Sequence, residues 1–131
     1  MPKLSAKSEE RLKECHPDIQ AVFYEVIKYV DFTVTCGQRG EEEQNEAFRT
    51  GKSKLKFPQS KHNQSPSLAI DVVPFPIDWN DTKRFYYFAG FVLGIAKAMD
   101  VDLRFGGDWD GDFDIKDQNF FDLPHFELKL K

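Results

Sequence analysis

Residues 68–74 read Leu-Ala-Ile-Asp-Val-Val-Pro, and this stretch decides the fold of the chain. Its aliphatic and β-branched side chains favour a β-strand. Pro74 and Pro76 end the run, because proline cannot donate a hydrogen bond to a neighbouring strand. We therefore predict a strand over residues 68–73, and its one charged side chain is Asp71.

Three more strands are predicted around this one. Residues 32–36 alternate apolar residues with threonine, as a half-buried strand does. Residues 101–105 and 124–130 form two short strands on either side of an acidic loop that contains glycine.

Four helices are predicted, and most have a recognisable start or end. They cover residues 8–14, 17–30, 41–50 and 82–99. Pro17 suits the first position of the second helix, Gly51 follows the third, and Asp81 can cap the fourth. The inward face of the fourth helix is predicted to consist of Phe85, Phe88, Ala89, Val92, Ile95, Ala96 and Met99. Because helices and strands are segregated rather than regularly alternating, the predicted class is α+β with a small antiparallel sheet.

The size and composition of the chain favour one globular domain over residues 1–131. A net charge of -4 indicates no strongly basic face for a nucleic acid. No apolar run is long enough to span a bilayer, and the N-terminus has no signal-peptide core, so we expect a protein made in the cytoplasm without stable membrane association. Cys15 and Cys36 are expected to be reduced and half-buried, and the four lysines of residues 52–61 to lie in a solvated loop.

The three histidines of the chain do not have the same surroundings. His16 precedes a proline and is assigned to a helix junction. His62, Asp71 and His125 together offer two imidazoles and one carboxylate, which is a usual protein ligand set for catalytic zinc and leaves one position for water. From spacing alone, ordinary turn and surface roles remain an alternative for these residues.

Two further carboxylates accompany His125. Asp122 precedes it by three residues, so a tight turn can place this group beside the metal as a general base. Glu127 shares one strand face with His125 and can orient its imidazole.

The chain resembles the zinc D-alanyl-D-alanine carboxypeptidase and L-alanyl-D-glutamate endopeptidase family, above all the single-domain endolysins of tailed phages. The motifs that carry this resemblance follow one another in a fixed order. They are Cys36-Gly37-Gln38-Arg39, Ser60-x-His62, Ala69-x-Asp71, Gly106-Gly107-Asp108-Trp109 and Asp122-x-Pro124-His125-Phe126-Glu127.

The resemblance implies a Hedgehog/D-Ala-D-Ala-peptidase-like zinc fold with the metal on a central antiparallel sheet. His62, Asp71 and His125 are then the zinc ligands and Asp122 the general base, with Arg39 stabilising the oxyanion. Gln38 and Ser60 are expected to position the substrate. Two departures are visible: the step from His62 to Asp71 is longer than usual, and Asp122 stands where many relatives have glutamate.

The acidic loop offers a second candidate for a cation. Alternating aspartates are found at positions 108, 110, 112 and 114, followed by Asp117. Oxygen ligands of this kind suit Ca²⁺, but the loop lacks the glycine and glutamate of an EF-hand. A solvated loop flanking the active site is the favoured interpretation, with Ca²⁺ binding as the alternative.

The predicted function is hydrolysis of the L-alanyl-D-glutamate bond in bacterial cell-wall stem peptides, by a monomer that acts on the wall after release. Hydrolysis of a D-alanyl-D-alanine terminus is a second choice. A cell-wall binding module without catalysis is a rival from another class, although a structural zinc usually has four protein ligands. A calcium-binding regulatory domain is the remaining rival.

Overall fold

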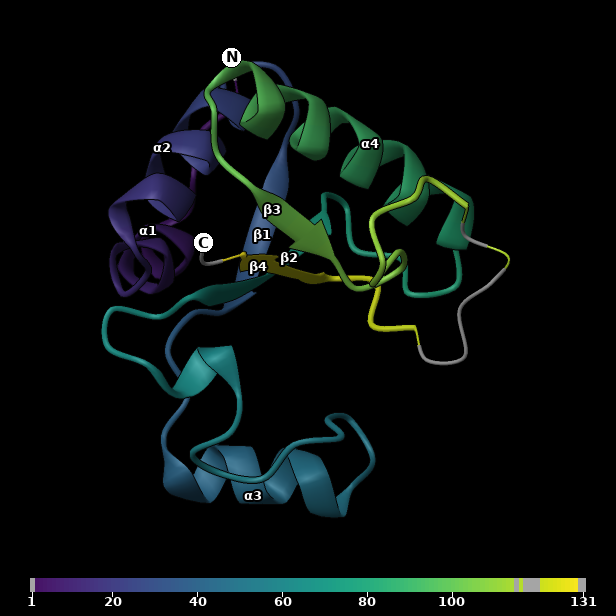
Figure 1. Ribbon diagram of the computed structural model, residues 1–131. Coiled ribbons are helices and arrows are strands. Elements are labelled where there is room, and N and C mark those ends of the chain that lie inside the picture. Colours follow the sequence, from purple (N-terminus) through teal and green to yellow (C-terminus); the bar gives the residue numbers. More distant parts are fainter. Residues whose placement is uncertain (1, 115, 117–120, 130–131) are drawn as a thin grey trace.

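The computed structural model describes residues 2–114, 116 and 121–129 (Figure 1). Its helices are α1 (Ala6–Lys13), α2 (Pro17–Val26), α3 (Glu41–Arg49) and α4 (Thr82–Ala98), with a 3₁₀ turn η1 (Lys61–Asn63). Its strands are β1 (Phe32–Cys36), β2 (Ala69–Pro74), β3 (Leu103–Phe105) and β4 (His125–Leu128). The predicted α+β class is confirmed. All four predicted helices and all four predicted strands are present, with shifts at their ends. The predicted end of the last strand, residue 130, lies outside the described residues.

The strands form one antiparallel sheet in the order β1-β2-β4-β3. The predicted strand around Asp71 is therefore an inner strand, paired on both sides. Asp71 lies directly opposite His125 in the register of β2 and β4, so the two side chains leave the sheet on the same face. Successive side chains alternate between the faces, which sends Ile70 and Phe126 to the other side.

The core fills that other side of the sheet, beneath α1, α2 and α4. Phe126 is at its centre and is fully buried. Its ring centroid lies 5.7 Å from Phe23 of α2, 6.3 Å from Phe88 of α4 and 5.4 Å from Phe105 of β3. Helix α3 lies apart from the other three helices, at the bottom of Figure 1. The fold thus separates an aromatic core from the sheet face that carries Asp71 and His125.

Local capping explains where the helices begin. The Ser5 hydroxyl accepts from the amide of Ser8 at 3.1 Å and starts α1, and Asp81 accepts from Arg84 at 3.3 Å and starts α4. The predicted junction at His16 is confirmed, since its Nδ1 accepts from the amide of Asp18 at 3.0 Å, and Pro17 opens α2.

Three detailed predictions need correction. Helix α2 ends at Val26, four residues before the end of its apolar stripe. Met99 is the C-cap of α4 and is 39% exposed, so it does not belong to the inward face. Ile95 is half-buried and packs against the core, as predicted. Cys15 is fully buried rather than half-buried, whereas Cys36 is half-buried as expected; both thiols are free. None of the described helices has the length and apolar character needed to cross a membrane.

Candidate metal centre and cleft

Three elements bring the predicted ligand residues together on the open face of the sheet. Asp71 comes from β2 and His125 from the facing position of β4. His62 comes from η1, a turn whose first residue is capped by Ser60: the Ser60 hydroxyl accepts from the amide of His62 at 3.2 Å. The turn fixes His62 with 1% of its surface exposed.

The tautomer of His62 follows from its hydrogen bonds. Its Nδ1 lies 2.7 Å from the carbonyl oxygen of Gly37. Because a carbonyl only accepts, Nδ1 donates to it and keeps its proton, and Nε2 points the other way. Nε2 is therefore the nitrogen whose lone pair becomes available when the ring is neutral. Nε2 faces Asp71 and His125.

In His125 the roles of the two ring nitrogens are exchanged: Nε2 donates a hydrogen bond, and Nδ1 faces the other two residues. Its Nε2 lies 2.8 Å from Glu127 Oε1 and donates to it. Burial opposes ionisation of Glu127, but its hydrogen bonds to His125 and Arg104 lower its pKa to about 2, so it is an acceptor. Arg104 and Lys61 both reach Glu127 Oε2, at 2.6 and 3.2 Å. The lone pair of His125 Nδ1 is therefore left facing the cluster.

Three electron-pair donors converge at this point. His62 Nε2 lies 3.2 Å from Asp71 Oδ1 and 3.3 Å from His125 Nδ1, and the third edge of the triangle is also 3.3 Å. Burial of His62 opposes its protonation, yet the Asp71 carboxylate raises the pKa of His62 to about 10. The pKa of Asp71 is lowered in spite of burial by the two imidazoles. The Asp71 carboxylate thus favours a positive charge beside it.

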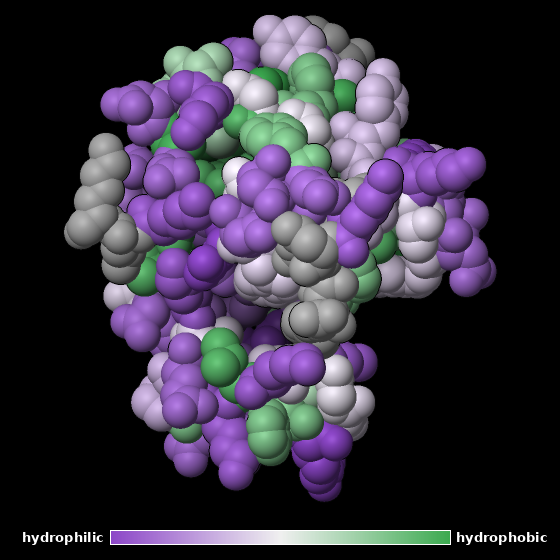
Figure 2. All heavy atoms as spheres, turned by 45° about the vertical axis from the view of Figure 1, so that its right-hand side comes forward, coloured by the Kyte–Doolittle hydropathy of each residue, from purple (hydrophilic) through white to green (hydrophobic). Residues whose placement is uncertain are grey.

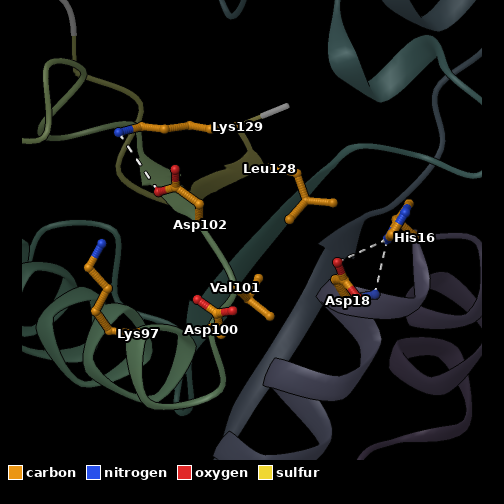
Figure 3. Close-up of a pocket in the computed structure, with 8 residues that line it drawn as sticks. All are labelled: His16, Asp18, Lys97, Asp100, Val101, Asp102, Leu128 and Lys129. Carbon is orange, nitrogen blue, oxygen red and sulfur yellow. Dashed lines mark hydrogen bonds and ion pairs between the residues drawn. The ribbon is translucent and has the colours of Figure 1, made fainter. Parts of the chain in front are cut away.

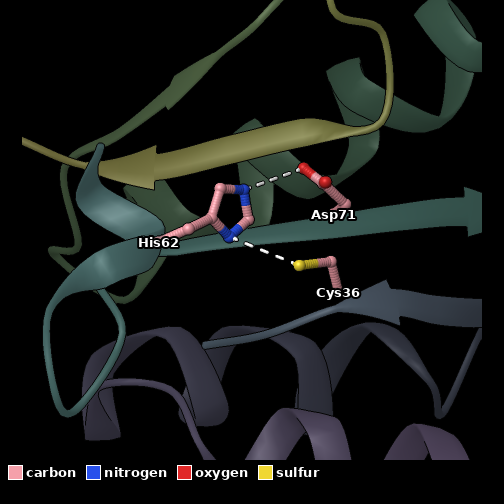
Figure 4. Close-up of side chains that lie close together, drawn as sticks. All are labelled: Cys36, His62 and Asp71. Carbon is pink, nitrogen blue, oxygen red and sulfur yellow. Dashed lines mark hydrogen bonds and ion pairs between the residues drawn. The ribbon is translucent and has the colours of Figure 1, made fainter. Parts of the chain in front are cut away.

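A second possible ligand set contains Cys36 in place of His125. Figure 4 shows why the two sets differ: Asp71 and Cys36 face opposite nitrogens of His62. The Cys36 sulfur lies 3.8 Å from Nδ1, the atom whose proton is directed to Gly37. A cation on Nε2 therefore has Asp71 and His125 as partners, and Cys36 lies on the far side of the ring.

The predicted base and the predicted oxyanion residue flank the cluster. Asp122 Oδ2 lies 3.8 Å from His125 Nδ1, and its side chain is 26% exposed. Burial and the charge of Asp71 raise the pKa of Asp122 to about 6. Arg39 donates to Asp71 Oδ2 at 3.3 Å and to Gln44 at 3.0 Å, so its guanidinium is fixed beside the same carboxylate.

Two hollows meet at the cluster, and Arg39 and Asp122 line both. The larger hollow, of about 920 Å³, extends from the cluster past α3 toward Trp79, Phe85 and Leu123. The smaller hollow, of about 340 Å³, extends toward Arg104 and Trp109. Figure 2 shows that the surface is hollowed between the part that carries α3 and the body of the molecule, with both hydrophilic and hydrophobic side chains at the edge of the hollow. The cluster thus lies in a surface cleft, at the point where the two hollows meet.

The two residues predicted to position the substrate lie in different places. Ser60 lines the smaller hollow, although its hydroxyl also caps η1. Gln38 lines neither hollow, and its amide donates to the carbonyl of Arg39 at 3.3 Å. Both roles stay predictions.

Several residues that shape the site were not found from the sequence. Gln44 of α3 is fully buried and ties Arg39 to Ser53 and to the carbonyl of Leu55. Lys61 was assigned to a solvated loop, but its amine bonds Glu127 and the carbonyl of Leu128. A polar residue on an apolar helix face is the signal that identifies Gln44, whereas nothing local distinguishes Lys61 from its neighbours.

Gly106 was quoted from the sequence as part of a family motif, but its role beside Asp122 was not predicted. A Cβ built on it would overlap the carbonyl oxygen of Asp122. Its presence in the Gly106-Gly107 pair is the signal, since glycine allows two backbones to approach closely.

The acidic loop contains a smaller group of carboxylates. Ligand atoms of Asp108, Asp110 and Asp112 lie within 4.8 Å of one another. Asp108 is 5% exposed, and its Oδ1 is the one buried side-chain oxygen or nitrogen of the described residues that has no hydrogen-bond partner. The predicted Asp117 of this loop lies outside the described residues.

A separate hollow of about 340 Å³ lies between the start of α2 and the segment that follows α4 (Figure 3). Asp18, Asp100 and Asp102 point into it together with Lys97 and Lys129. It shares no residue with the cluster, and its charges are mixed.

The chain is similar to known proteins over nearly its whole length. The family model described as phage L-alanyl-D-glutamate peptidase matches residues 1–129. The L-alanyl-D-glutamate peptidase of Escherichia phage T5 is 31% identical over 134 residues, which cover 96% of this chain and 97% of that protein. The crystal structure of Serratia marcescens L-Ala D-Glu endopeptidase ChiX superposes with a TM-score of 0.74 at 30% identity, covering 96% of this chain and 89% of that one.

Proposed function

This chain belongs to the phage L-alanyl-D-glutamate peptidase family, and from that premise we propose that it hydrolyses the L-alanyl-D-glutamate bond of peptidoglycan stem peptides as a zinc enzyme. His62, Asp71 and His125 are the proposed ligands of one zinc ion. Asp122 is the proposed general base, and Arg39 the residue that stabilises the oxyanion.

The triangle of ligand atoms is the observation that carries the proposal. A tetrahedral zinc ion with bonds of about 2.0–2.1 Å has ligand atoms about 3.3–3.4 Å apart. The three edges of the cluster measure 3.2, 3.3 and 3.3 Å. Two neutral imidazole lone pairs and a carboxylate at this spacing fit such an ion, and the arrangement leaves one position open.

When bound, zinc supplies a Lewis acid that polarises the scissile carbonyl and acidifies water. Asp122 is the residue of this chain that transfers the proton. Its carboxylate accepts the proton of the attacking water and delivers it to the leaving amine. The raised pKa of Asp122, about 6, suits this exchange because the group can both accept and release a proton near neutral pH.

Arg39 stabilises the charge that develops on the carbonyl oxygen. Its side chain is 15% exposed and already fixed by Asp71 and Gln44. A cation held in place before the reaction costs little reorganisation when charge appears, which is the main advantage of such a group. Glu127 and the Gly37 carbonyl keep the two imidazoles in the tautomers that metal binding requires.

The test compares metal content with product release. Protein stripped with a chelator should release no peptide from purified peptidoglycan, and zinc should restore the release. Asp122→Asn should bind one zinc per chain and release almost nothing. Asp102→Asn, which changes a carboxylate outside the cleft, is the matched control and should remain active.

Mass spectrometry of the fragments then identifies the bond. Cleavage between L-alanine and D-glutamate gives fragments that begin with D-glutamate, whereas a carboxypeptidase releases single D-alanine. A wild-type protein that binds zinc and releases neither product would contradict the enzyme proposal and favour a wall-binding module.

We also propose that the acidic loop binds Ca²⁺. The support is the buried, unpartnered Oδ1 of Asp108 beside Asp110 and Asp112, because burying a carboxylate oxygen without a partner is costly and a hard cation removes that cost. Calcium should raise the melting temperature of the wild type, and Mg²⁺ should do so less. Asp108→Asn should abolish the calcium effect.

We propose that residues 1–131 act as a single catalytic domain and as a monomer on the cell wall. The continuous core beneath the sheet supports one domain. Sedimentation of the zinc-loaded protein tests the monomer, and a concentration-dependent dimer would contradict it.

A further inference from the structure

The two hollows that meet at the metal cluster carry opposite charge. The smaller hollow is lined by the cations Arg39, Lys54, Lys61 and Arg104 and by two carboxylates, Asp122 and Glu127. The larger hollow is lined by two cations, Arg39 and Lys52, and by four carboxylates, Glu43, Glu46, Asp71 and Asp122. One end of the cleft is thus cationic and the other anionic.

The positive charge of the smaller hollow is not cancelled by its own carboxylates. Glu127 is shared between Arg104 and Lys61, so one carboxylate faces two cations. Lys54, in the loop after α3, also lines this hollow and adds a further cation from a different segment of the chain. Arg104 also lies over the ring of Trp109 at 5.8 Å, which fixes the plane of its guanidinium.

The proposed substrate has a matching asymmetry. The glutamyl residue on the carboxyl side of the scissile bond has two carboxyl groups, and only one of them continues the peptide. The other is free and ionised at neutral pH. The alanine on the amino side carries no charged side chain. A molecule with one anionic end is oriented by a cleft with one cationic end.

We propose that the smaller hollow binds the free carboxylate of the D-glutamyl residue, with Lys54 and Arg104 as the cations that face it. The amino side of the substrate then lies along the larger hollow. This inference rests on the proposed peptidase function and adds the direction in which the substrate binds.

The experiment uses two synthetic stem peptides that differ in one group: the free glutamyl carboxyl is a carboxylate in one and an amide in the other. Zinc-loaded wild type should cleave the carboxylate peptide with a kcat/KM about tenfold higher. Lys54→Gln should reduce that ratio about fivefold, mainly by lowering kcat/KM for the carboxylate peptide. Lys54→Arg should restore the ratio.

Lys52→Gln is the matched control, because Lys52 lies in the same loop but lines the other hollow. It should leave the ratio of the two kcat/KM values unchanged. Equal cleavage of both peptides by the wild type, or a ratio lowered by Lys52→Gln and not by Lys54→Gln, would overturn the inference and leave the peptidase function intact. A wild type that cleaves neither peptide would instead overturn the proposed function.

Discussion

The amide of Asp122 donates a 2.9 Å hydrogen bond to the carbonyl of Gly106, at a point where the two backbones lie too close for a side chain on Gly106. The amide of Gly106 in turn donates to the carbonyl of His125 at 2.8 Å. The end of β3 therefore fixes the turn that joins the proposed base to a proposed ligand.

Gly106→Ala should displace Asp122 more than the ligand triangle, because the added Cβ would overlap the backbone of Asp122. The printed bond from Gly106 to a proposed ligand goes to the main-chain carbonyl of His125 and not to its ring. We expect kcat to fall about a hundredfold, as small displacements of a catalytic group can cost that much. Zinc content should stay at one per chain. Gly90→Ala is the control, since a Cβ there meets no atom within 4 Å, and it should stabilise α4 by about 0.5–1 kcal/mol.

Metal content distinguishes the two candidate ligand sets. Asp71→Asn should lose zinc, since Asp71 supplies the only carboxylate of the triangle and is shared by both imidazoles. Cys36→Ala should keep one zinc per chain with an affinity close to wild type, because its sulfur faces Nδ1 of His62. Loss of zinc from Cys36→Ala would instead indicate that Cys36, His62 and Asp71 are the ligands.

Glu127→Gln should weaken zinc binding about 10–100-fold while the fold is retained. The amide keeps the shape of the side chain but loses the charge that holds the proton on His125 Nε2. Competition with a chromophoric chelator measures the change, and circular dichroism checks the fold. An unchanged zinc affinity would show that His125 needs no help from Glu127.

The lowered pKa of Glu127 predicts how the stability of the metal-free protein depends on pH. The pKa of Glu127 is lowered from 4.5 to about 2 in the folded state. A depressed pKa means that the stabilisation is fully present above pH 4.5 and is lost as the pH falls through about 2. The difference in unfolding free energy between wild type and Glu127→Gln should therefore shrink over that window, as followed by urea denaturation at several pH values.

Catalysis should have an acid limb set by Asp122. A base works only when deprotonated, and burial with the charge of Asp71 raises the pKa of Asp122 to about 6. A bound cation lowers that value, so kcat/KM should fall as the pH drops below about 6, with a midpoint at or below it. A midpoint above pH 7 would assign the limb to another group.

Trp79 should contribute to kcat/KM only when the substrate carries sugar. Its ring is 58% exposed at the larger hollow and stacks on Phe85 with centroids 5.7 Å apart. In peptidoglycan the amino side of the alanine continues toward the glycan strand, and that side is assigned to this hollow. Trp79→Ala should lower kcat/KM for a muropeptide and leave that for the free stem peptide nearly unchanged. An equal loss on both substrates would indicate a general effect on the fold.

Much of the architecture could be predicted because local patterns and tertiary structure agree. Proline and aspartate at the helix starts, and β-branched runs in the strands, have the same meaning in isolation as in the folded chain. The alternation of β4 also predicted that Glu127 would share a face with His125, and their side chains are bonded at 2.8 Å.

The remaining features depend on partners that are distant in the sequence. The proton position on His62 is set by the carbonyl of Gly37, 25 residues away, and no side-chain pattern reports a backbone carbonyl. In the sequence, Lys61 cannot be distinguished from the neighbouring lysines, because its partner Glu127 comes from the distant strand β4. The opposite charges of the two hollows likewise arise only when the fold brings α3, η1 and β3 close to the cluster.

The two imidazoles are oriented by different kinds of group, and this difference bears on how the enzyme can evolve. His62 is held by the main-chain carbonyl of residue 37, and every residue type has such a carbonyl. A substitution at position 37 therefore keeps the acceptor itself and affects His62 only through the steric clash of the new side chain with the backbone of Arg11. His125 is held by a side chain that one nucleotide change can alter. Natural variation can therefore adjust the basicity of one ligand gradually while the other stays constant, which offers descendants of this sequence a route to different metal affinities without replacing a ligand.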